Sequence, residues 1–294
     1  MRVTNSMIRE GALQGLNTNA TSLAQIQEQL SSSKLLNRPS DDPAQVSQAM
    51  KVRDSLSELE QFTRNINAAD QTVSASDTAM ASAGELIQRA SELAIQGANA
   101  TYSASDRQAM AVEVEQLARQ LVQLAGTKVG DTYIFSGFKS ATPPYSEAAP
   151  GSAAVSAYGG DTGKVVARIA PGTTAQVNVT ADVVFKPALD ALNLLQGELS
   201  AGTPVSSATI TAISTGHDAL LSGRATVGAL QNRLDGTAAF ITQATTAAQQ
   251  LLSQTEDIDM AAVITQYSAR QLTYNAALKV NAQIMQTSLL DYLK

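Results

Sequence analysis

The sequence predicts a mainly α-helical fold: an elongated helical bundle and coiled coil built by the N- and C-terminal halves, with a small β-rich insert domain between them. Apolar side chains recur at every seventh position in each half, which indicates long packed helices. Six of the eight prolines lie within residues 130–205, which indicates a different structure there. With 294 residues, 44% of them apolar, the chain can bury substantial cores.

The first and last stretches of the chain are predicted to be helices that carry very little charge. Glu28 is the only charged residue within 11–33, and Lys279 is the only one within 271–290. A helix that faces water normally has a charged face. We therefore predict that residues 1–36 and 257–294 form a terminal coiled-coil layer whose polar faces contact other protein, as in a subunit of an assembly.

A linker at residues 37–43 follows the first helix. Its sequence, NRPSDDP, contains two prolines that break a helix, and Ser40 and Asp41 can accept hydrogen bonds from nearby backbone N–H groups. A new helix is expected to begin near Asp42. Charged residues become frequent directly afterwards, so the linker is predicted to separate two layers that pack independently.

Two long helices define the predicted rod domain, which comprises residues 44–130 and 206–256. In the first half, the seven-residue repeat consists of Val52, Leu59, Ile66, Val73, Met80, Ile87 and Ala94. In the second half it consists of Ile213, Leu220, Val227, Leu234, Ile241 and Ala248. Small residues such as Ala83, Gly216 and Gly223 accompany both repeats and would allow a partner helix to approach closely.

A third helix is predicted at residues 106–127, folded back antiparallel on the first long helix. Ser105 and Gln108 have the spacing of a capping box. The apolar positions that follow alternate between steps of four and three residues: Met110, Val114, Leu117, Leu121 and Leu124. The short link at residues 97–105 favours an antiparallel neighbour, so these helices should form a bundle.

Residues 131–205 are predicted to form the β-rich insert domain. Three runs favour strands, at residues 132–135, 164–169 and 175–180. Turns are expected at residues 159–161 and at Pro171–Gly172, and a short helix at residues 188–199. Because the insert lies midway along the chain, both of its ends must return to the bundle.

The composition argues against several classes of protein. A net charge of −6 without any basic run argues against nucleic acid as a partner. No apolar stretch reaches the roughly 18 residues of a membrane span, and the N-terminus lacks the apolar core of a secretory signal, so we predict neither membrane insertion nor a cleaved signal. The absence of cysteine removes disulfides and thiol nucleophiles.

Catalytic and metal-binding residues are also scarce. His217 is the single histidine, and neither a nucleophile nor a metal motif accompanies it and Asp218. The acidic pairs Asp41–Asp42 and Asp257/Asp259 are explained by helix capping. We therefore predict no enzymatic activity, no cofactor and no metal site.

Four strings of the sequence resemble the bacterial flagellin superfamily. GLNTNATSL, at residues 15–23, resembles the N-terminal region of flagellins. NRPSDDPA at 37–44, YIFSG at 133–137 and LKVNAQIMQTSLLDYL at 278–293 resemble its hook-filament junction family, hook-associated protein 3, more closely than flagellin itself. The resemblance covers about residues 1–138 and 206–294 and leaves the insert unassigned.

This resemblance implies a structural subunit of the bacterial flagellum. Members of that family form an adapter ring between hook-associated protein 1 and the flagellin filament, outside the cell. They are exported without a cleaved signal by the flagellar type III export apparatus, with a flagellar export chaperone as a further partner. Their ends are expected to become ordered on assembly. Two alternatives stay open: a flagellin filament subunit, and a rod-like surface-binding or adhesin module.

The resemblance also suggests residue roles. The intramolecular seam of the terminal layer would comprise Leu16, Leu23, Ile26, Leu30, Tyr267, Tyr274, Leu278, Met285 and Leu289. The subunit interface would comprise Asn17, Asn19, Gln27, Asn275, Asn281 and Gln283, together with a second patch at Arg89 and Glu92. Arg89 and Glu92 are also spaced to pair with one another on one helix, so both interpretations of that patch remain open.

Overall fold

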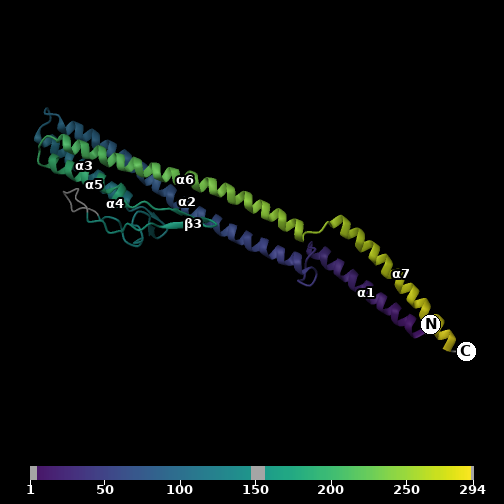
Figure 1. Cartoon of the computed structure of the whole chain (residues 1–294). Helices are drawn as coiled ribbons and strands as arrows, with labels where there is room; N and C mark the ends of the chain where they lie inside the picture. The colour runs from purple at the N-terminus through teal and green to yellow at the C-terminus, as the bar shows by residue number, and fades with distance from the viewer. Residues whose placement is uncertain (1–4, 147–155, 293–294) are drawn as a thin grey trace. The chain divides into compact units, whose positions relative to one another are not determined.

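Helices dominate the chain, which a computed structural model describes for residues 5–146 and 156–292 (Figure 1). In order, the elements are α1 Asn5–Ser32, α2 Pro43–Ala98, α3 Ala104–Ala125, β1 Lys128–Val129, β2 Thr132–Tyr133, β3 Val166–Ala170, β4 Thr173–Gln176, α4 Ala181–Val184, α5 Lys186–Ser200, α6 Ser207–Glu256 and α7 Met260–Tyr292. They form two compact units. One contains the chain up to Glu58 and from Ala244 onward, and the other contains residues Leu59–Gln243. The predicted mainly helical fold is confirmed.

The seven-residue repeats form the buried stripes of the two long helices. In α2, all seven repeat positions from Val52 to Ala94 are buried. In α6, the positions from Ile213 to Ile241 are buried, whereas Ala248 is half-buried. Periodicity therefore identified the packing faces of both helices, because a helix buries the residues that return to one side every two turns.

Glycines on the inward face of α6 allow the insert helices to approach closely. A Cβ atom at Gly216 would lie 2.7 Å from the Cα atom of Ala188 in α5. At Gly223 it would lie 3.0 Å from both the Sδ atom of Met80 and a methyl group of Val184. At Gly216 the backbone of α5 leaves no room for a side chain, and at Gly223 the neighbouring side chains would have to move, so α5 and α4 pack closely on α6.

Helix α3 begins earlier than the sequence predicts. The N-cap is Ser103: its Oγ accepts a bond from the Asp106 backbone N–H at 3.2 Å, and the Asp106 carboxylate accepts one from the Ser103 N–H at 3.0 Å. The pKa of Asp106 is lowered by the bond that the Ser103 hydroxyl donates to its carboxylate at 2.7 Å, and next by the bond from the Ser103 N–H. The predicted capping box at Ser105 and Gln108 is wrong. The capping box lies two residues earlier, at Ser103 and Asp106, and the Gln108 side chain donates to the Ser200 carbonyl.

The insert contains two short hairpins and two helices, so strands contribute less than the sequence predicts. Strand β1 pairs antiparallel with β2, and β3 with β4 through a turn at Pro171–Gly172, where Gly172 adopts φ +67°. The predicted strand at residues 175–180 stops at Gln176. After it, side-chain bonds of Asn178 take the place of strand-to-strand backbone bonds: its Oδ1 atom accepts from the Val165 N–H, and its Nδ2 atom donates to the Gly163 carbonyl.

Side chains of two helices close the outer edges of the β3–β4 hairpin. Asn65 of α2 donates to the Arg168 carbonyl at 2.8 Å, and Arg233 of α6 donates to the Thr174 carbonyl at 2.6 Å. Arg168 also lies over the ring of Phe62, 5.3 Å from its centroid. Open strand edges invite pairing with other chains, and these contacts satisfy one outward carbonyl on each strand.

The YIFSG string, residues 133–137, forms the buried base of the insert. The Phe135 ring is fully buried and meets Phe185 edge-to-face at 4.9 Å. The backbone carbonyl of Phe135 accepts hydrogen bonds from the Ala181 N–H and from the Tyr158 hydroxyl. Burial raises the pKa of Tyr158 to about 12, so this hydroxyl keeps its proton at neutral pH. The string is therefore explained by packing within the subunit.

An aspartate holds the turn that ends this string. Gly137 has φ +67°, and the Asp161 Oδ1 atom accepts bonds from the Phe138 N–H at 2.7 Å and the Gly163 N–H at 2.8 Å. These two bonds, that from Phe138 first, lower the pKa of Asp161. The charged carboxylate thus stabilises the folded turn.

We predict opposite effects for two glycine substitutions in α6. Gly216→Ala should destabilise the protein by about 1–3 kcal/mol, because the new methyl group meets the α5 backbone. Gly228→Ala, in the same helix but with open space around the new methyl group, should stabilise it by about 0.5–1 kcal/mol. Urea unfolding followed by circular dichroism measures both. Equal effects would contradict the close packing at Gly216.

We also predict a pH-dependent loss in Asp161→Asn, which keeps the accepting oxygen and removes the charge. Because the folded pKa lies below the ordinary 3.8, the carboxylate stabilises the wild type above that pH, and its contribution is lost as the pH falls through the lowered value. The stability difference between the two proteins should thus be largest at neutral pH and shrink in acid. Asp218→Asn, at an exposed position of α6, is the control and should show no such trend.

Candidate assembly surface

The two terminal helices pair antiparallel within the first unit. Figure 1 shows α1 and α7 side by side. At one end, the Leu35 N–H donates to the Glu256 carbonyl at 2.6 Å, and the Ile258 N–H donates to the Ser33 carbonyl at 3.4 Å. Toward the other end, Asn281 Nδ2 donates to the Ala12 carbonyl at 3.4 Å. The N-terminal end of α1 therefore lies beside the C-terminal half of α7.

Heptad-spaced stripes line the contact between these helices. In α1 the buried or half-buried positions include Ala12, Leu16, Asn19, Leu23, Ile26 and Leu30. In α7 the corresponding positions are Val263, Tyr267, Tyr274, Ala277 and Asn281. The structure thus brings together six of the residues proposed for the seam. Met285 and Leu289, also proposed for it, lie outside the described side chains.

Three positions differ from the roles suggested by the sequence. Leu278 is 41% exposed, and the neighbouring Ala277 takes the inward place. Asn19 and Asn281, proposed as outward contacts, lie on the inward stripes, and Asn281 binds the α1 backbone. For the two α7 positions, the reason is that α7 has apolar residues around its whole circumference, so the inward side could not be recognised from periodicity.

The outward faces of this pair combine uncharged polar residues with exposed apolar ones. Asn17, Gln27, Asn275 and Gln283 are exposed. Large apolar side chains lie beside them with 50–73% exposure: Met7, Leu13, Ile264, Leu272 and Val280. Among the described side chains of α1 and α7, only Ile26 and Val263 are buried apolar residues. Exposed apolar surface on this scale is typical of a site that another protein covers.

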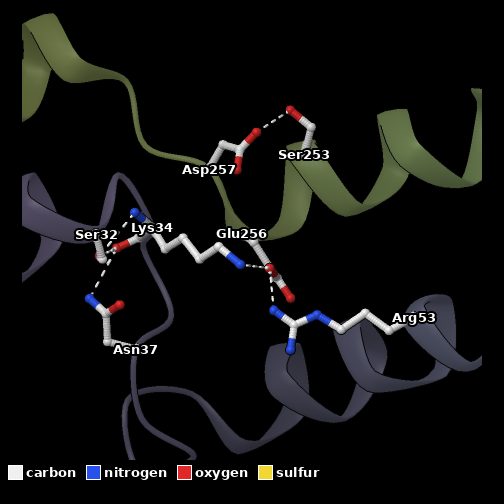
Figure 2. A network of polar contacts seen from close by, with 7 residues as sticks. All are labelled: Ser32, Lys34, Asn37, Arg53, Ser253, Glu256 and Asp257. Atoms are coloured by element: carbon white, nitrogen blue, oxygen red, sulfur yellow. Dashed lines mark hydrogen bonds and ion pairs between the residues drawn. The ribbon is translucent and has the colours of Figure 1, made fainter.

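A buried carboxylate joins the segments that meet where α1 and α6 end. The Glu256 side chain is only 4% exposed, and its Oε2 atom lies 3.1 Å from Lys34 Nζ and 2.6 Å from Arg53 Nη2 (Figure 2). Lys34 and Arg53 are themselves half exposed. Sequence reasoning missed this cluster, because its members are distant in the chain and each looks like an ordinary surface charge.

The linker between α1 and α2 is ordered by its own side chains. The Asp41 carboxylate accepts bonds from the Asn37 and Arg38 N–H groups. Asp42 caps α2, accepting from the Ala44 and Gln45 N–H groups at 3.0 and 3.1 Å, and α2 begins at Pro43. These contacts explain the NRPSDDP string as a turn followed by a capped helix start.

The second patch is an ion-pair cluster within one chain. Arg89 lies 2.9 Å from Glu92 on α2 and 2.8 Å from Glu113 on α3. These contacts, with Glu113 first, raise the pKa of Arg89. Ile95 and Val112, on the same two helices, are 61% and 59% exposed. The structure therefore supports the pairing of Arg89 with Glu92 and leaves the contact with a neighbouring subunit as a proposal.

Within 5–146 and 156–292, no three His, Asp or Glu side chains gather as metal ligands would. His217 lines a cavity of about 310 Å³ with Gln88, Ser91 and Ser214. In the same part of the chain, no helix combines the length and apolarity needed to cross a bilayer.

Comparison with known proteins gives the family. The chain matches the bacterial flagellin N-terminal helical region over residues 3–140 and the bacterial flagellin C-terminal helical region over residues 210–293. Among curated proteins it is 32% identical over 148 residues to flagellar hook-associated protein 3 of Escherichia coli K12, covering 50% of this chain and 47% of that protein. The chain thus spans about half the length of the first curated relatives that it matches.

Two further comparisons extend over more of the chain. The flagellar filament 30.7 kDa core protein of Treponema maltophilum is 29% identical over 264 residues, which cover 87% of this chain and 86% of that protein. A solved structure of a putative flagellar hook-associated protein from Vibrio parahaemolyticus superposes with a TM-score of 0.65 at 20% identity. It covers 74% of this chain and 100% of that one, and shows the shared fold. Matched over both its N- and C-terminal regions, the chain belongs to the bacterial flagellin family.

Proposed function

We propose that this protein is a non-enzymatic structural subunit of the bacterial flagellum that forms an adapter ring between the hook and the flagellin filament. Its partners would be further copies of itself, hook-associated protein 1 on the hook side and flagellin on the filament side. It would act outside the cell, after export without a cleaved signal by the type III export apparatus and its chaperone.

The observation that carries this proposal is the unsatisfied surface of the α1–α7 pair. Each helix covers one stripe of the other, yet Leu13, Leu272 and Val280 remain 54–73% exposed. The polar residues between them are mostly uncharged, so covering them with protein costs less in desolvation than covering charged groups would. Sister copies and neighbouring ring proteins would bury this surface.

The junction role is supported by three strings and by the curated relatives. NRPSDDPA, YIFSG and the C-terminal string resemble the hook-associated protein 3 family, and the Escherichia coli relative bears that name. A filament subunit is the second candidate, because the Treponema maltophilum filament protein matches over most of its length. Both candidates use the same assembly surface and differ in the partners that it meets.

Deleting the gene separates the two candidates. If the protein is the junction adapter, cells should build hooks and secrete unassembled flagellin monomer into the medium. Electron microscopy of hooks and immunoblotting of culture supernatants measure both. If it is flagellin, the secreted monomer itself should disappear. If the protein is instead an adhesin, its loss should abolish surface binding and leave hooks and filaments intact.

Two α1 substitutions test the assembly surface. Leu13→Asp should block ring formation but preserve the α1–α7 pair, because Leu13 is 59% exposed in the single subunit and becomes buried only on assembly. Leu23→Asp should block assembly and also disrupt the pair, since Leu23 lies on the inward stripe. Sedimentation measures assembly and circular dichroism measures helix content. Wild-type assembly by Leu13→Asp would overturn the proposed surface.

A further inference from the structure

A cleft lies between the insert and one face of α6, within the unit formed by residues Leu59–Gln243. It encloses about 670 Å³, a volume typical of ligand-binding pockets. The insert lines it with residues 162–164, 176–180 and 183–184. α6 lines it with side chains that return every three or four residues: Ala219, Ser222, Thr226, Ala229 and Arg233. Most of these α6 side chains are small, so they leave the space between the helix and the insert unfilled.

The cleft is elongated. Its lining runs along α6 from Ala219 to Arg233, which corresponds to about 21 Å of helix. A peptide in extended conformation covers that length with about six residues. The dimensions therefore suit a segment of polypeptide laid along the helix better than a compact small molecule.

Most of the lining is apolar. Six Val and Leu residues contribute to it: Val177, Val179, Val183, Val184, Val227 and Leu230. Val183 is 61% exposed, so a bound segment would remove apolar surface from water there. The Asn178 side chain, also in the lining, already has partners in the Val165 N–H and the Gly163 carbonyl. The insert side of the cleft therefore offers mainly apolar contacts.

Both charged side chains in the lining are cations. Lys164 and Arg233 are exposed, and neither forms an ion pair within residues 5–146 and 156–292. Arg233 donates through Nη2 to the Thr174 carbonyl, and its guanidinium has further N–H donors. The chain as a whole has a net charge of −6. Because the charges of the cleft have the opposite sign, they favour an anionic occupant.

Two backbone N–H groups in the lining have no acceptor. Val179 and Thr180 follow the end of β4, and both are half-buried. Across the ranges that the structure describes, neither N–H donates to another residue. Unpaired backbone donors in a partly buried cleft favour a ligand that brings oxygen acceptors. Peptide carbonyls and carboxylates both supply such acceptors.

An aromatic ring is fixed beside the cleft. Phe138 is 68% exposed, yet its N–H donates to Asp161 Oδ1 at 2.7 Å. Its ring lies so close to Gly163, a lining residue, that a Cβ atom at that position would overlap it. A ring that is already held in place loses little conformational freedom when a partner packs on it. Phe138 is thus suited to contact an apolar side chain of a bound segment.

We propose that this cleft binds an extended peptide segment of a partner protein, and that the segment carries both acidic and apolar side chains. Its carboxylates pair with Lys164 and Arg233, and its apolar side chains pack on the valines and on Phe138. Charge complementarity selects this occupant, because a basic segment would meet two cations and a neutral one would gain nothing from them. The inference goes beyond the proposed function, which depends on α1 and α7 and not on this cleft.

A labelled hexapeptide tests the proposal on the full chain. The probe is fluorescein-labelled Asp-Val-Glu-Val-Asp-Val, and fluorescence polarisation follows its binding at protein concentrations that sediment as monomer. Two labelled peptides of equal length are the comparisons: Asn-Val-Gln-Val-Asn-Val lacks the charges, and Asp-Gly-Glu-Gly-Asp-Gly lacks the apolar side chains. The acidic apolar probe should bind at least about tenfold more tightly than either, because it alone meets both the cations and the valines.

Two matched pairs of substitutions locate the site. Ala229→Trp fills the cleft from an exposed position of α6 and should weaken binding of the probe at least about tenfold. Ala239→Trp, exposed on the same helix outside the cleft, should leave binding unchanged. Lys164→Gln should weaken binding about two- to fivefold, as the loss of an exposed ion pair does. Lys51→Gln removes the same charge from an exposed position of α2 and should have no effect. Circular dichroism checks that all four variants keep their helix content.

Three results would overturn the proposal: equal binding of the three peptides, equal effects of the two Trp variants, or equal effects of the two Lys variants. The first two would place binding on other exposed apolar surfaces, and the third would remove the charge pairing that selects the occupant. The readout uses single subunits, so a failed peptide test leaves the proposed flagellar role untouched. Conversely, a chain that forms no ring would still bind the probe if the cleft works as proposed.

Discussion

A single partner helix cannot bury a helix that has apolar side chains around its whole circumference, and this constraint applies to α7 in the terminal layer. α1 covers one stripe of α7, which leaves Ile264, Leu272 and Val280 at least half exposed. In the proposed assembly, further protein would cover those residues, and the uncharged surface around them costs less to desolvate than a charged one would. The exposed apolar side of α7 is thus set by its sequence.

In the unit formed by residues Leu59–Gln243, by contrast, the apolar side chains of the repeats are buried within the chain. Its repeat residues in α2 and α6 are buried against one another and against the insert helices, and its glycines allow α5 to reach the α6 backbone. The buried Arg107 side chain donates to three carbonyls of this unit, those of Gly97, Asn99 and Gly202. This unit buries most of its large apolar side chains internally, whereas the terminal pair leaves many of its own exposed.

Sequence reasoning succeeded where one period dominated. The α2 stripe from Val52 to Ala94 and most of the α6 stripe follow from the spacing alone, because a buried face must recur with the helix. It failed where side-chain hydrogen bonds set the ends of helices and strands. The bonds between Ser103 and Asp106 place the α3 N-cap at Ser103, and Asn178 bonds the backbone where strand propensity predicted that the strand would continue. In the assembly surface, Leu278 and Asn281 were misplaced because α7 offers no single apolar side. The Glu256 cluster joins residues more than 200 positions apart, which no spacing rule reveals.

The closed edges of the β3–β4 hairpin have a consequence for how the insert tolerates change. Because Asn65 and Arg233 cap its outer carbonyls from the long helices, the hairpin is anchored at its flanks and not at its tip. At the tip, Gly172 has open space around it. Extra sequence placed there would extend away from the anchored edges without disturbing them. The hairpin therefore offers a natural position for displaying foreign peptides or for evolutionary lengthening of the insert.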